Sequence, residues 1–170
     1  MGNKIVFEET QRFKQWWIWV ILSAVNGLFL FGVFRQVIGG HPFGDKPMSD
    51  SGLLFLTVMM LALTIAFLFF KLETFIKEDG IYVRFFPMHL TFKHYTWDQI
   101  KKSYVRTYAP LAEFGGWGLR FGLFGKGIAY NVSGNQGLNL EFIDGKKILI
   151  GTNKPDEITE ALKKIGQLKT

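Results

Sequence analysis

Cysteine is absent from this sequence, and proline is scarce, with 5 residues in 170. Without cysteine the chain has no disulfide framework, no thiolate nucleophile and no cysteine-based zinc site. Charged residues make up only 20% of the chain, whereas 48% is hydrophobic and 16% aromatic. The apolar excess lies in two long runs near the start, which leave about 100 residues for a single small domain.

Acidic residues are also in the minority, at 14 against 20 lysines and arginines, which gives a net charge of +6. Residues 71–170 carry 15 of the basic and 10 of the acidic residues, so +5 of the surplus lies there. No helix-turn-helix, zinc-finger or RNA-binding aromatic motif accompanies this charge, so nucleic acid is not an expected partner. Anionic lipid head groups are the expected partner, since each nearby cation contributes roughly 1 kcal/mol.

Two uncharged runs, at 15–34 and 51–70, each contain about 20 residues, enough to cross the hydrocarbon core of a bilayer as a helix. Trp16, Trp17 and Trp19 open the first run, and tryptophan is favoured at membrane interfaces. We therefore predict transmembrane helices at 16–34 and 52–70, joined by an outer loop at 35–51. A signal peptide is the competing interpretation of the first run, but no small-residue cleavage site follows it.

The flanking charges predict the topology of this multi-pass protein. Lysine and arginine favour the cytoplasmic side, and more of them flank the two runs than lie in the loop between them. The flanking cations are Lys4, Arg12, Lys14, Lys71 and Lys77, against Arg35 and Lys46 in the loop. We expect a cell-membrane location with both termini cytoplasmic, and we interpret residues 1–15 as a juxtamembrane helix or arm.

A few small and polar residues interrupt the predicted membrane helices. Asn26 lies near the middle of the first helix, and Ser23 and Gly27 are four residues apart on one face. In an antiparallel hairpin Thr57 would lie at a similar depth to Asn26, so we expect an interhelical hydrogen bond between them. These four residues are candidate helix–helix contacts, either as a packing detail or as an oligomer contact or ligand site.

From Leu72 onward the sequence predicts seven or eight short strands. Glu78-Asp79-Gly80 and Asp144-Gly145 are typical hairpin turns between alternating apolar runs. A terminal helix follows, with Pro155 in its first turn. Its apolar residues share one face at i, i+3, i+4 and i+7 spacing and must be buried. They are Ile158, Ala161, Leu162 and Ile165.

Four segments carry a resemblance to a known group of proteins: FEETQRF at 7–13, GGWGLRFG at 115–122, AYNVSGNQGLNLEF at 129–142 and GKKILIGTNKPDEI at 145–158. The chain resembles bacterial membrane proteins that place two transmembrane helices before a bacterial pleckstrin-homology-like (PH-like) domain. The resemblance implies an antiparallel PH-like barrel at 72–170, capped by the terminal helix. It also implies a cytoplasmic interaction module close to the membrane, with no assigned reaction.

The first hairpin of this domain departs from PH domains that bind phosphoinositides. Those domains place lysines and arginines around the first hairpin turn, whereas this chain has Glu78 and Asp79 there. Phosphates would be repelled, so we do not expect specific phosphoinositide recognition. Diffuse attraction to acidic lipid remains compatible with the sequence.

The sequence offers no constellation that points to catalysis. The three histidines, His41, His89 and His94, lack metal-ligand spacing, and the carboxylates are scattered singly. Ser133 has no recognisable base, and the glycine-rich segment around Trp117 matches neither a Walker nor a Rossmann motif. We therefore expect no enzyme activity, cofactor or metal, and we interpret these glycines mainly as bulges and corners.

The densest basic and aromatic stretch provides the candidate binding residues. They are Lys93, Lys101, Lys102 and Arg106, with Trp117 as an additional partner contact. The alternative is that the cations only form a solvated strand face. We predict an interaction or scaffolding domain held at the membrane surface, binding a protein partner or anionic lipid. The alternative function is a structural subunit of an oligomeric transporter or channel assembly, in which the chain forms a homo-oligomer.

Overall fold

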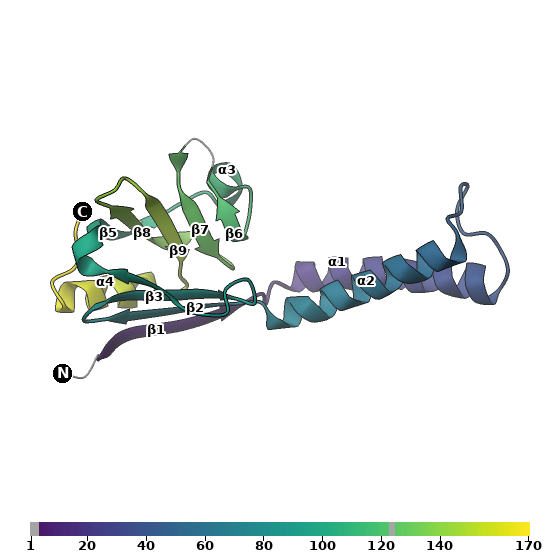
Figure 1. Cartoon of the computed structure of the whole chain (residues 1–170), viewed down its shortest axis with the longest axis horizontal. Helices are drawn as coiled ribbons and strands as arrows, with labels where there is room; N and C mark the ends of the chain where they lie inside the picture. The colour runs from purple at the N-terminus through teal and green to yellow at the C-terminus, as the bar shows by residue number, and fades with distance from the viewer. Residues whose placement is uncertain (1–3, 123–124) are drawn as a thin grey trace. The chain divides into compact units, whose positions relative to one another are not determined.

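The computed structural model describes residues 4–122 and 125–170 and divides into two compact units (Figure 1). The first unit, which we call the β domain, contains residues 1–13 and 70–170. The second unit, the helical hairpin, runs from Lys14 to Phe69. The hairpin is therefore an insertion within the β domain, whereas the sequence predicted that the whole domain would follow it.

The helical hairpin consists of α1 (Trp16–Val33), a π-helical continuation (Phe34–Ile38) and α2 (Asp50–Phe69). Its two helical stretches have 23 and 20 residues with mean hydropathies of 2.0 and 2.5, so both are long and apolar enough to span a membrane. Exposed apolar side chains surround both helices. The first helical stretch ends four residues later than predicted, which shortens the connecting loop.

Residues Ile5–Arg12 form the first strand, β1, which pairs antiparallel with β2 (Lys71–Lys77). The expected juxtamembrane helix or arm is therefore wrong for these residues, and residues 1–3 lie outside the described part of the chain. The inward positions of β1 are Phe7, Glu9 and Gln11. Because two of the three are polar, the segment lacks the alternation of apolar and polar residues by which a strand is recognised in a sequence.

The strands form two sheets, of order β1-β2-β3-β4 and β5-β8-β9-β7-β6. The strands not yet given are β3 (Gly80–Phe86), β4 (Lys93–Thr96), β5 (Ile100–Thr107), β6 (Gly118–Phe121), β7 (Ile128–Asn131), β8 (Gln136–Phe142) and β9 (Lys147–Gly151). The described residues from Lys71 onward form eight strands, in agreement with the predicted seven or eight. The predicted antiparallel barrel is wrong, since the sheets are not closed into one ladder and β7 pairs parallel with β9.

The terminal helix α4 (Pro155–Lys164) contacts β1 of the first sheet and β5 and β8 of the second (Figure 1). Ile158, Ala161 and Leu162 are buried in one core with residues of both sheets, and Ile165 packs against it. The predicted apolar face of this helix is confirmed. Each fully buried aliphatic side chain contributes roughly 1.5–3 kcal/mol, so the helix holds the two sheets together.

Candidate functional site

The strand that precedes the helical hairpin is attached to the segment that leads into α4. Glu9 is buried, and its carboxylate accepts hydrogen bonds from the Thr152 hydroxyl at 2.6 Å and the Asn153 backbone N–H at 2.9 Å. Gln11 is also buried and donates from Nε2 to the Gly151 carbonyl at 2.7 Å. These bonds satisfy polar groups that would be costly to bury alone. They make β1 an integral part of the β domain.

One end of the first sheet carries both connections to the helical hairpin, and we call it the anchor end. Arg12 pairs with Lys71 there, and Lys71 pairs with Phe86 of β3. Phe13 and Phe70, the residues just beyond the paired strands, contact each other with ring centroids 6.5 Å apart. Three residues separate β1 from α1, and one residue separates α2 from β2.

Cations at the anchor end are held by one carboxylate. Glu73 lies 2.8 Å from Lys71 Nζ and 2.6 Å from Arg84 Nη2. Partial burial opposes ionisation of Glu73, but the hydrogen bonds from Lys71 and Arg84 outweigh it and keep the pKa of Glu73 below its usual value. With Arg12, which is exposed, the paired strands place three cations, Arg12, Lys71 and Arg84, and the Glu73 carboxylate at this end.

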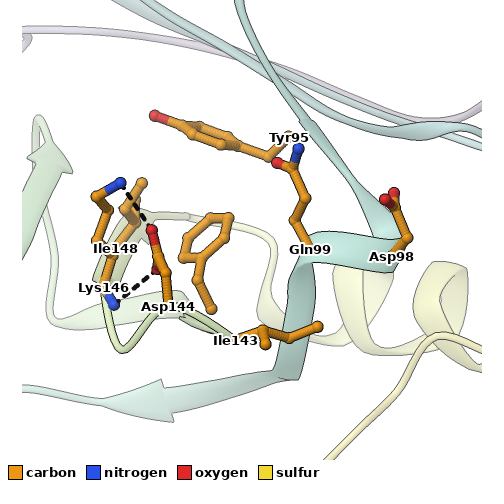
Figure 2. Close-up of a pocket in the computed structure, with 8 residues that line it drawn as sticks. Tyr95, Asp98, Gln99, Ile143, Asp144, Lys146 and Ile148 are labelled. Atoms are coloured by element: carbon orange, nitrogen blue, oxygen red, sulfur yellow. Dashed lines mark hydrogen bonds and ion pairs between the residues drawn. The ribbon is translucent and has the colours of Figure 1, made fainter.

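A pocket of about 510 Å³ lies at the opposite end of the first sheet, which we call the far end (Figure 2). The far end is where Lys77 pairs with Gly80 and Gly80 with Thr96. The chain then turns through Trp97–Gln99 into β5. The pocket is lined by Tyr95, Asp98, Gln99, Phe142, Ile143, Asp144, Lys146 and Ile148.

Both sheets contribute to the pocket, because the end of β8 lies against the turn between β4 and β5. The Ile143 backbone N–H donates to the Gln99 carbonyl at 3.0 Å. The predicted Asp144-Gly145 turn is confirmed between β8 and β9, with Gly145 at a φ of 85°. In Figure 2 the Asp144–Lys146 pair lies on one wall and Asp98 and Gln99 on another.

The charged groups of the pocket are fixed in their ionised forms near neutral pH. A hydrogen bond from Thr96 lowers the pKa of Asp98. Asp144 and Lys146 form an ion pair of 2.7 Å, which lowers the pKa of the carboxyl and raises that of the amine. Burial, with a smaller effect from Tyr130, raises the pKa of Tyr95 above its usual value. The pocket thus combines apolar walls with fixed charges, which suits binding of a ligand or partner.

Of the predicted basic residues, Lys101 and Lys102 lie at the start of β5, directly after the turn that lines the pocket. Lys101 is exposed and falls where the β5–β8 register is irregular, and Lys102 is half-buried opposite Glu141. They belong to the second sheet and lie next to the far end of the first sheet. The seven residues of β2 span roughly 20 Å between the anchor end and the far end.

Arg106 has a structural role that the sequence did not reveal. Its guanidinium binds the Glu113 carboxylate through two hydrogen bonds of 3.1 and 2.8 Å. These bonds, aided by the Ala109 backbone N–H, hold the pKa of Glu113 at about 2 despite partial burial. Arg106 also donates to Asn139 at 3.3 Å. The side chain attaches α3 (Pro110–Phe114) to the second sheet.

Lys93 lies in the first sheet, apart from the other predicted cations on β5. Its Nζ donates to the Tyr130 hydroxyl at 3.1 Å, and Tyr130 is fully buried. Lys93 thus helps to satisfy a hydroxyl of the core. Trp117 is half-buried and donates from Nε1 to the Gly134 carbonyl at 3.0 Å. The predicted stretch of basic residues is therefore divided between two sheets.

In the helical hairpin Asn26 is buried and donates to Thr64 Oγ1 of α2 at 2.7 Å. The predicted pairing of Asn26 with Thr57 is wrong. Thr57 is buried but donates to the Leu53 carbonyl of its own helix at 2.7 Å. Thr64 lies seven residues after Thr57, which is about two helical turns along the same face of α2. Ser23 and Gly27 are exposed and lie outside the contact between the two helices.

The sequence missed most of the pocket. Its lining residues come from two segments more than 40 residues apart, 95–99 and 142–148, and no local pattern links the two. The Asp144-Gly145 turn was predicted as part of a hairpin, but a turn motif does not say what faces it. Within residues 4–122 and 125–170, no three histidine, aspartate or glutamate side chains come together as a metal-binding group.

No protein-family model matches this sequence, and neither a curated protein nor a solved structure matches it.

Proposed function

We propose that this protein is a membrane-anchored interaction domain. In this proposal α1 and α2 span the cell membrane, and the β domain binds a protein partner on the cytoplasmic side through the pocket at its far end. The arrangement of two sheets and a terminal helix is compatible with a PH-like domain. The parallel β7–β9 pair and the inserted hairpin depart from the layout that the resemblance implies.

The observation that carries the proposal is the pairing of β1 with β2 across the inserted hairpin. Because Arg12 lies opposite Lys71, the segments before α1 and after α2 must be on the same side of a membrane. An even number of spans meets this requirement, and the excess of flanking cations favours the cytoplasm for that side. The short connections, of three residues and one residue, keep the β domain close to the bilayer.

The position of the lysines favours a protein partner over the anchoring bilayer. Lys101 and Lys102 lie at the far end, roughly 20 Å along the strands from the anchor end. That distance exceeds the Debye length of about 8 Å at physiological ionic strength. Exposed Ile143, beside the pocket and these lysines, offers an apolar contact of the kind found at the centres of interfaces.

The membrane part of the proposal is tested by labelling single cysteines in the otherwise cysteine-free chain. In intact cells a membrane-impermeant maleimide should label the Asp45→Cys variant in the loop and should not label Lys101→Cys. The full chain should also stay in membranes washed with alkaline carbonate. Labelling of Lys101→Cys in intact cells, or extraction by carbonate, would refute the proposal.

The interaction part is tested by comparing partners that co-purify with full-length variants in mild detergent. Ile143→Asp and the double variant Lys101→Glu/Lys102→Glu should lose a partner that the unchanged chain retains. Phe121→Asp is the matched control, because Phe121 is 77% exposed, compared with 70% for Ile143, and does not line the pocket. If all variants retain the same proteins, the far end is not the binding surface.

A second candidate, a subunit of an oligomeric membrane assembly, is favoured by the exposure of Ser23 and Gly27 on α1. A Cβ atom added at Gly27 would meet nothing within 4 Å in the single chain. Gly27→Leu should therefore leave the single chain intact and would reduce the oligomer mass in native mass spectrometry if α1 packs against another copy. An unchanged mass would refute this candidate.

A further inference from the structure

The loop between β3 and β4 presents two large apolar side chains to solvent. Met88 is 61% exposed and Leu90 is 73% exposed. Two hydrogen bonds hold the loop, one between these residues and one at Leu90. The His89 backbone N–H donates to the Phe85 carbonyl at 2.8 Å, and Arg84 Nη1 donates to the Leu90 carbonyl at 3.2 Å. The exposed side chains thus belong to a loop whose backbone is held in one conformation by hydrogen bonds.

This loop lies at the anchor end of the first sheet. Phe86, the last residue of β3, pairs with Lys71, the first residue of β2. Neighbouring strands are about 4.8 Å apart, and each further residue adds at most about 3.6 Å. Phe86 is therefore one strand spacing from Lys71, and Lys71 is the second residue after the end of α2 at Phe69. The loop that begins after Phe86 thus starts beside the point where the chain leaves α2, on the side of the first sheet where a bilayer spanned by α2 would present its head groups.

The charges of the anchor end suit an anionic surface. Arg12, Lys71 and Arg84 lie on three adjacent strands, with Glu73 as the carboxylate among them. The Arg84 guanidinium lies 4.3 Å from the centre of the Phe92 ring, which keeps the cation beside the apolar loop. Exposed apolar side chains next to cations are typical of protein surfaces that insert into the membrane interface.

We propose that Met88 and Leu90 insert into the interface of the bilayer that α1 and α2 span, as a third contact between this protein and the membrane. The inference rests on the proposed function, because it requires the two helices to be in that bilayer. Its consequence is a fixed orientation of the β domain. With the anchor end on the bilayer, the pocket and Ile143 face the aqueous side.

The test uses the full chain in vesicles of phosphatidylcholine and phosphatidylglycerol. Single cysteines are introduced as Met88→Cys or Leu90→Cys, with Ile143→Cys as the matched control at the far end, and are labelled with an environment-sensitive fluorophore. Surface substitutions of this kind usually change stability by less than about 0.5 kcal/mol. Nitroxide-labelled lipids should quench the probes at positions 88 and 90 several-fold more than the probe at 143, and their emission should shift to the blue.

Equal quenching at 88, 90 and 143 would overturn the inference. A blue shift without nitroxide quenching would also overturn it, because a protein or a second copy would then cover the loop. Carbonate extraction of the same labelled samples separates the two proposals. If the chain stays in the membrane while the probes remain unquenched, only the loop contact fails; if the chain is extracted, both proposals fail.

Discussion

The β domain and the helical hairpin place their apolar side chains in opposite ways. The β domain encloses a core of fully buried aliphatic and aromatic residues, and polar groups such as Glu9 are buried in it with hydrogen-bond partners. The helical hairpin instead exposes most of its apolar side chains, and its buried residues include Asn26 and Thr57. The first arrangement is stable in water, whereas the second is the one expected of helices in an apolar solvent.

The prediction with the largest expected effect is that the β domain requires β1 in order to fold and does not require the helical hairpin. A chain that begins at Lys71 should fail to fold cooperatively, because it lacks the strand that pairs with β2 and contacts the α4 segment. The loss should exceed the roughly 5–15 kcal/mol by which small domains are stable. Circular dichroism during urea titration measures it.

The matched variant replaces residues 14–69 by Asn-Gly, which suits a two-residue hairpin turn between the neighbouring strand ends. Phe13 and Phe70 are kept because they pack against the core. This excised β domain should be soluble and unfold in one cooperative transition. An excised domain that does not fold, or a truncated chain that does, would contradict the division into two units.

The second prediction compares one apolar residue from each region. Leu162 is fully buried, so Leu162→Ala should lower the free energy of unfolding of the excised β domain by roughly 2–5 kcal/mol. Phe55 on α2 is 69% exposed, and Phe55→Ala in the full chain should change the stability of the β domain by less than about 0.5 kcal/mol. Thermal unfolding of the full-chain variants in detergent micelles measures the stability of the β domain. If Leu162→Ala and Phe55→Ala lower this stability by similar amounts, the two regions do not differ as proposed.

The third prediction concerns the polar contact inside the hairpin. Thr64→Val removes the acceptor of the Asn26 side chain on the other helix, so the pair should lose about 0.6–1.7 kcal/mol of hairpin stability. Thr57→Val is the control, since Thr57 donates only within its own helix in the described contacts. Reversible unfolding in detergent compares them. A larger loss for Thr57→Val would restore the pairing that the sequence predicted.

The smallest predicted effect concerns Glu113 in the β domain. Its pKa in the folded chain is about 2, below the usual 4.5, so the ionised form stabilises the fold above pH 4.5 and this contribution is lost as the pH falls from 4.5 to 2. Glu113→Gln should lower the free energy of unfolding of the excised domain at pH 7 by about 1 kcal/mol. This difference from the unchanged excised domain should disappear at low pH. Urea titrations of both proteins across this pH range measure it.

The control for Glu113 is Glu157→Gln, which breaks an exposed pair with Lys154 and should have almost no effect. If the difference in unfolding free energy between Glu113→Gln and the unchanged domain does not vary with pH, the charge of the carboxylate is not the source of the stabilisation. The same contact makes Arg106 unsuitable for testing lipid binding, since replacing it would disturb Glu113. Lys101 and Lys102 remain suitable.

Local patterns explain what could be predicted. The uncharged runs, the Asp144-Gly145 turn and the apolar face of α4 depend on residues close in sequence, and each was found where the pattern placed it. The strand β1 was missed because Glu9 and Gln11 fill inward positions that are normally apolar. Their partners, Thr152 and Asn153, follow about 140 residues later, so no local signal could reveal them.

The sequence by itself determined which segments are apolar enough to span a membrane and, apart from β1, where the strands lie, because composition and periodicity decide both. Only the tertiary structure decided that α1 and α2 are inserted between two paired strands of one sheet. It also decided that Arg106 binds Glu113 and that Asn26 donates a hydrogen bond to Thr64. Those outcomes depend on which distant segments pair and in which register. Strand pairing and helix length set that register through contacts between residues far apart in the chain.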